Sequence, residues 1–223
     1  MQLAAIKKAR ALTMIEVDEL NRGGKVRLAD CVAPLVERYN FLNFPKEPKD
    51  FDLSDKGVRF EEGKAKGLTI EALVIYDGAL LVDTLSSTED SKEILMEMLN
   101  WGRDTLGLTY APDMLKKWGY ISQVIFYSEV PLLCQMSSPI QNLAAKTSAV
   151  TESLWSGLKY EPTNISIGHD PSVRKHQIAS LFIQHRINSR FDENKYFSEA
   201  PLPTHLHVQF LEEFEADVLK YRD

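Results

Sequence analysis

Alternating and continuous runs of apolar residues in the middle of the chain predict β-strands. Residues 58–61 alternate apolar and charged side chains, which is typical of a half-buried strand. Two strongly apolar runs follow at 69–76 and 79–85, separated only by Asp77 and Gly78. An Asp-Gly pair favours a type I′ turn, in which both central residues have a positive φ. We therefore predict an antiparallel hairpin here.

The remaining apolar pattern predicts helices and further strands. Pro34 should start or kink the helix that contains it, because proline lacks a backbone donor. Ser86 and Ser87 can cap a helix that Gly107 is placed to end. We expect helices at 1–12, 28–39, 88–106, 112–118, 138–156 and from 204 onward. Strands are expected at 13–19, 121–130, 165–169 and 181–187, and irregular connections at 40–57 and 188–203.

The order of these elements predicts the fold class. Consecutive strands joined by tight turns give a mainly antiparallel sheet, and amphipathic helices cover one face of it. The sequence thus predicts an α+β protein built as a two-layer sandwich. The 223 residues fit a single domain, in which residues 1–57 could form an N-terminal arm and linker.

Composition narrows the class of partner. The chain is 44% hydrophobic and 26% charged, with a net charge of −6, which is typical of a globular protein. Proteins that bind duplex nucleic acid usually carry a basic surplus, so nucleic acid is an unexpected partner. No apolar run approaches the ~20 residues of a membrane span. We expect a cytoplasmic protein that does not bind membranes.

Two cysteines do not suggest a disulfide framework or a zinc site. Cys31 and Cys134 lie in apolar surroundings and resemble small buried hydrophobic residues. They form no Cys-x-x-Cys pair. We predict no cofactor and no metal.

Two groups of residues are candidates for catalysis. Glu62 and Lys64 follow a predicted strand, where carboxylates and a lysine can hold Mg²⁺ and activate water. His169 and His185 lie on apolar strand faces with His176 between them, and paired strands could bring two of them together. Each group also has a purely structural interpretation, as a turn or as a hydrogen-bonded histidine.

The aromatic connection at 188–203 is the candidate interface. It contains Arg190, Phe191, Tyr196 and Phe197, residue types that are enriched where proteins meet. The alternative is that its rings simply dock on the core.

These observations lead to three functional hypotheses. The first is a non-enzymatic interaction or assembly module that self-associates or binds a protein partner. The second is a metal-dependent hydrolase or nuclease, and the third is a regulatory domain that binds a small ligand between sheet and helices. The balance is against an enzyme, because no catalytic motif is visible in the sequence.

Overall fold

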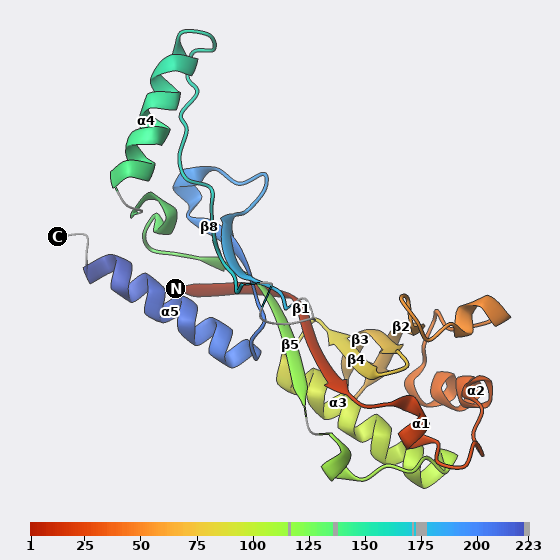
Figure 1. Ribbon diagram of the computed structural model, residues 1–223. Coiled ribbons are helices and arrows are strands. Elements are labelled where there is room, and N and C mark those ends of the chain that lie inside the picture. Colours follow the sequence, from red (N-terminus) through yellow and green to blue (C-terminus); the bar gives the residue numbers. More distant parts are fainter. Residues whose placement is uncertain (116, 136–137, 171, 173–177, 221–223) are drawn as a thin grey trace. The chain divides into compact units, whose positions relative to one another are not determined.

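The computed structural model describes every residue except 116, 136–137, 171, 173–177 and 221–223 (Figure 1). The chain divides into two compact units. We call residues 6–122 with 202–204 the N-terminal unit, and residues 1–5, 123–201 and 205–223 the C-terminal unit. Strands β1 (Gln2–Met14) and β5 (Trp118–Tyr127) contribute residues to both. The single domain expected from the sequence, with 1–57 as an arm, stays a prediction.

The N-terminal unit is built on strands in the order β2-β3-β4-β1-β5. The strands β2 (Val58–Ala65), β3 (Leu68–Ile75) and β4 (Ala79–Thr84) form two antiparallel hairpins. Strand β1 pairs antiparallel with β4, from Ala9 opposite Thr84 to Met14 opposite Ala79. The sequence therefore places the central hairpin correctly.

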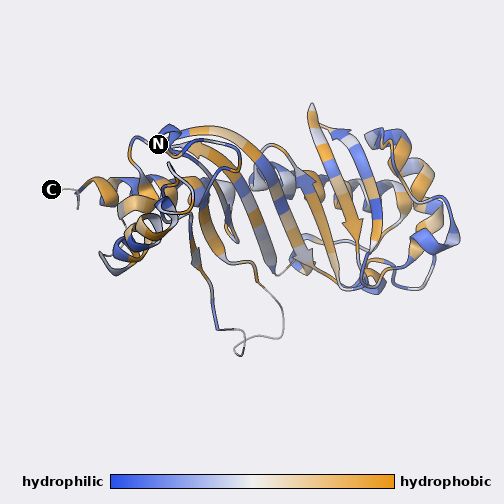
Figure 2. Ribbon diagram, turned by 90° about the horizontal axis from the view of Figure 1, so that it is seen from above, coloured by the Kyte–Doolittle hydropathy of each residue, from blue (hydrophilic) through white to orange (hydrophobic). Residues whose placement is uncertain are grey.

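The helices of this unit cover one face of its strands. The helices are α1 (Val17–Leu20), α2 (Leu28–Tyr39) and α3 (Thr88–Trp101), and α3 ends in a π-helical turn, Gly102–Leu106. One buried cluster joins Leu35 of α2 and Ile94 of α3 to Phe60 of β2 and Val82 of β4. Hydrophobic and hydrophilic residues alternate along the strands (Figure 2), as a sheet with a covered face requires.

The C-terminal unit has strands in the order β5-β8-β7-β6. Strands β6 (Asn164–Ile167), β7 (Leu181–His185) and β8 (Lys195–Ala200) pair antiparallel. Its helices are α4 (Ser138–Glu152) and α5 (Thr204–Lys220). The α+β class with an antiparallel sheet is confirmed. No helix in the described part of the chain is long and apolar enough to cross a membrane.

The N-terminal segment is a strand, so the helix expected at residues 1–12 and the strand expected at 13–19 are wrong. Ala9, Ala11 and Thr13 are buried in alternation, a period-two pattern that small side chains made hard to see. Arg10 donates two hydrogen bonds, of 2.6 and 2.7 Å, to the carboxylate of Asp83 directly across on β4. Pairing with β4 decides the conformation here, because it satisfies backbone groups that local preference cannot.

The type I′ turn lies elsewhere than predicted. Asp77 and Gly78 do not have a positive φ. Lys66 (φ 51°) and Gly67 (φ 80°), which join β2 to β3, both do. The carbonyls of Asp77 and Gly78 instead accept hydrogen bonds from Val17 and Ile15, at 2.8 and 3.2 Å. These tertiary bonds fix the peptide orientation in the β3–β4 turn.

Two predictions about the C-terminal third are also wrong. Residues 188–203 are not an irregular connection throughout, because they contain β8, in which Tyr196, Ser198 and Ala200 are buried. A serine and an alanine on the inner face weaken the apolar alternation of that strand. The apolar spacing of the last helix predicts that Phe210 and Leu219 are buried, but both are exposed.

Helix α3 begins where the sequence predicts. The side chain of Ser87 accepts a hydrogen bond from the backbone N–H of Asp90, at 3.0 Å. We expect Ser87→Ala to lower the free energy of unfolding by about 1 kcal/mol, because that N–H loses its partner. Urea unfolding measures the change, and Ser87→Thr, which keeps the hydroxyl, should retain most of the stability. Equal stability of the alanine and serine proteins would contradict this assignment.

Candidate interaction surface

Helix α4 presents a row of apolar side chains to solvent. Leu143 and Val150 are each 67% exposed, Leu154, just beyond the end of the helix, is 65% exposed and Ile140 is 41% exposed. The spacing of three and seven residues places Ile140, Leu143 and Val150 on one side of α4, and Leu154 follows four residues later in the turn beyond the helix. We call these four residues the α4 face. The row belongs to the helix that the sequence predicts at residues 138–156.

The opposite side of α4 already has a partner in its own unit. The Ser148 hydroxyl accepts a hydrogen bond of 2.8 Å from the backbone N–H of Tyr160, so the chain that follows α4 returns along it (Figure 1). The Glu152 carboxylate accepts from the backbone N–H of Gly157, at 3.0 Å, where φ is +84°. Helix and returning chain form one arm, and the α4 face lies on its open side.

The arm also carries little charge. Lys146 and Glu152 are the only charged residues of α4, and their charges cancel, although the whole chain has a net charge of −6. Soluble monomers rarely expose a contiguous apolar surface rimmed by polar residues unless it contacts another molecule. The α4 face can therefore bind a second apolar surface, and the charge of that surface has little influence on the binding.

The four predicted interface residues do not form one surface. Tyr196 is fully buried, and its hydroxyl accepts from the backbone N–H of Leu132 at 3.0 Å. Phe197 lies 5.7 Å from Phe182, centroid to centroid, and is half-buried. Only Arg190 is largely exposed, and it pairs with its neighbour Asp192. An interface role of Arg190, Phe191 and Phe197 stays a prediction.

Glu62 and Lys64 lie on β2 and are exposed. Glu62 has a φ of 57°, and one of its carboxylate oxygens accepts a hydrogen bond from the Asn43 side chain at 3.1 Å. Asn43 and Glu61 form an isolated antiparallel β-bridge, so Glu62 is adjacent to this bridge in the sequence. A catalytic role of Glu62 and Lys64 stays a prediction.

The candidate histidines His169 and His185 lie at opposite ends of the paired strands β6 and β7. His169 is exposed, and its Nδ1 lies 3.0 Å from the Asp170 carbonyl oxygen. His185 is buried between the rings of Phe191 and Tyr196, each 4.7 Å away. Burial lowers the pKa of His185, which favours the neutral ring. His176 lies outside the described residues.

A cysteine and a carboxylate meet near His185. The Cys134 thiol donates to Glu161 at 3.1 Å, and Glu161 is also paired with Lys159. Burial, followed by the bond to Glu161, raises the pKa of Cys134 to about 11, so the group is a neutral thiol rather than a nucleophilic thiolate. Within the described ranges, no group of three or more His, Cys, Asp or Glu side chains could hold a metal ion.

Comparison with known proteins gives no further guidance to the site. A scan against models of protein families finds no match, and a search of curated proteins finds no similar sequence. The functional argument rests on the geometry described above.

Proposed function

We propose that this protein is an assembly module that pairs with a second copy of itself through the α4 face. The observation that supports the proposal best is the row of four exposed apolar side chains, three on one side of α4 and the fourth, Leu154, just beyond its end. Burying a leucine or valine side chain is worth about 1.5–3 kcal/mol, so four of them provide a substantial driving force.

The spacing of the α4 face suits contact between two helices. Apolar residues three and four positions apart, repeated over seven, form the contact row of paired helices. Ile140, Leu143 and Val150 fall on this pattern, and Thr147 occupies the intervening position. A second α4 presents the same row, so the surface is self-complementary in shape and type.

Charge also favours a second copy over a strongly charged partner. A basic or acidic partner would need opposite charges around the α4 face, and the helix has one of each sign. Two copies of an acidic protein repel one another, and contact through its nearly neutral helix minimises that repulsion. As part of this proposal we keep the cytoplasm as the location, which two free cysteines support.

The test is the oligomeric state of a double variant. We expect the wild type to sediment as a dimer and Leu143→Asp/Val150→Asp to weaken dimerisation by at least about 100-fold, because two buried contacts are replaced by carboxylates. Sedimentation equilibrium over a concentration series measures the dissociation constant.

The matched control moves the same two charges one residue along the helix. Asn142→Asp/Ala149→Asp has the same spacing and also replaces two exposed, uncharged residues, but lies beside the α4 face. We expect this variant to remain dimeric. A monomeric wild type would refute the proposal, and equal weakening in both double variants would show that charge, not the face, is responsible.

A further inference from the structure

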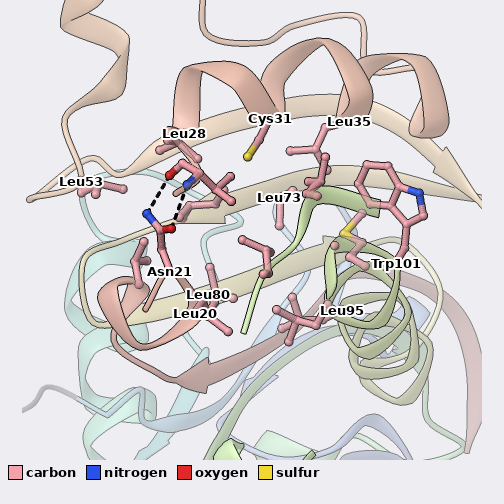
Figure 3. A pocket seen from close by; sticks show the side chains of 18 of the residues that line it. Leu20, Asn21, Leu28, Cys31, Leu35, Leu53, Leu73, Leu80, Leu95 and Trp101 are labelled. Atoms are coloured by element: carbon pink, nitrogen blue, oxygen red, sulfur yellow. Dashed lines mark hydrogen bonds between the residues drawn. The ribbon is translucent and has the colours of Figure 1, made fainter. Parts of the chain in front are cut away.

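The N-terminal unit encloses a cavity between its strands and its helices. The cavity, seen from close by in Figure 3, has a volume of about 260 Å³ and is only partly enclosed. Leu73 of β3 and Leu80 of β4 form its floor, and Leu35 of α2 and Leu95 of α3 form facing walls. All four of these side chains are buried. The space is therefore bounded by buried apolar side chains.

The lining contains very few polar side chains, and two of them, Asn21 and Cys31, have hydrogen-bond partners within the protein. The Asn21 side chain donates to the Val26 carbonyl at 2.7 Å and accepts from the Val26 N–H at 3.0 Å, as the dashed lines in Figure 3 show. The Cys31 thiol lies 3.6 Å from the Arg27 carbonyl, and burial raises its pKa, so it is neutral. Asp18, which is exposed, is the one charged residue among the described residues of the lining.

The space exists because a small side chain occupies a central position. Cys31 points from α2 into the cavity, and most of the side chains around it are leucines, from α2 itself and from the other elements (Figure 3). A long apolar side chain at position 31 would fill much of the volume. Three of the lining residues, Val17, Leu53 and Trp101, are only half-buried and Asp18 is exposed, so the cavity reaches the surface.

We propose that this cavity binds a small, neutral, apolar molecule of roughly the size of two fused aromatic rings or a comparable alkyl chain. An apolar cavity of about 150 Å³ stays dry and binds benzene, so a larger cavity of the same character suits a larger hydrocarbon. Binding sites for small molecules are typically concave and mainly apolar. An anionic ligand would find no cation among the described lining residues and would meet the exposed carboxylate of Asp18.

The first test compares three probes by calorimetric titration of the full chain. Naphthalene and 1-octanol should bind and raise the melting temperature, because a ligand that binds only the native state stabilises it. Octanoate should bind at least about tenfold more weakly than 1-octanol, since it carries a carboxylate. Absence of binding by both neutral probes would overturn the proposal, and equal affinity for octanoate would overturn the requirement for a neutral ligand.

A pair of variants at one position locates the site. Cys31→Phe should place a ring in the cavity and weaken naphthalene binding at least about tenfold, whereas Cys31→Ala should leave it nearly unchanged. Equal binding by the folded phenylalanine variant would exclude this cavity. If that variant does not fold, nuclear Overhauser effects in the wild type decide the matter. We expect them between naphthalene and the methyl group of Met98, which lines the cavity, and their absence in the bound state would refute the site.

Discussion

Replacing Phe41 by alanine is expected to lower the free energy of unfolding by about 3–5 kcal/mol, since this is the usual cost of removing a buried phenylalanine ring. Phe41 is 2% exposed although it lies in the irregular connection that follows α2. Its ring centroid is 5.4 Å from that of Phe60. A Cβ atom on Gly63 would lie 2.5 Å from the ring, so glycine allows the ring to rest directly on β2.

The adjacent residue provides the control for this prediction. Leu42 is 66% exposed, so Leu42→Ala should change stability by no more than about 0.5 kcal/mol. Urea unfolding is best followed by tryptophan fluorescence in a Trp155→Phe background, because the other two tryptophans, Trp101 and Trp118, belong to the N-terminal unit. A loss below about 1 kcal/mol for Phe41→Ala would mean that the ring does not anchor the connection.

The elements predicted correctly are those whose signals are local. The hairpin of β3 and β4 follows from two apolar runs and a short turn, and α3 follows from its cap at Ser87 and from Gly107, which has a φ of 77°. Each signal lies within a few residues of the structure it determines. A sequence pattern can therefore reveal it without knowledge of the fold.

The errors arise where distant residues determine the structure. The strand at Ala9 and Ala11 depends on pairing with β4 and on α3, from which the Ser91 hydroxyl donates to the Ala9 carbonyl at 2.7 Å. Neither contact can be predicted from the sequence of residues 1–12 alone. The turn at Asp77 is likewise set by bonds to residues 15 and 17. Tertiary hydrogen bonds outweigh local preference at both places.

The candidate surface illustrates a different limit. The pattern at Ile140, Leu143 and Val150 correctly predicts a helix with an apolar side, but it contains no information about what covers that side. A buried stripe and an interaction surface have the same spacing. The sequence could not predict the cavity beside Cys31 either, because the volume of a cavity depends on how side chains from several elements pack together.

Lowering the pH from 7 to 4 is expected to remove about 3 kcal/mol of stability through His207 alone. His207 is fully buried, and its Nε2 lies 2.8 Å from the Ser198 hydroxyl oxygen. That hydroxyl donates to the Phe182 carbonyl at 2.8 Å, so it accepts a hydrogen bond from the Nε2–H of His207. Burial lowers the pKa of His207 from 6.5 to about 4.

The direction of this effect follows from proton binding. Between pH 6.5 and 4 the unfolded chain has a protonated histidine while the folded chain keeps a neutral one, so acid favours unfolding. Stability from this residue is complete above pH 6.5 and is lost as the pH falls toward 4. Urea unfolding at pH 7, 6, 5 and 4 measures the slope. Carboxylates contribute to acid destabilisation in every variant, so the comparison between variants isolates the histidine.

Two substitutions on α5 distinguish the contribution of His207 to the pH dependence from that of neighbouring residues. His207→Gln keeps a donor toward Ser198 but does not titrate, and it should reduce the loss of stability between pH 7 and 4 by about 3 kcal/mol relative to the wild type. His205→Gln changes an exposed histidine two residues away and is the matched control for the substitution itself. If both glutamine variants show the slope of the wild type, His207 is not held neutral by burial. A reduced slope in His207→Gln alone would mean that the contact between α5 and β8 makes the C-terminal unit sensitive to acid.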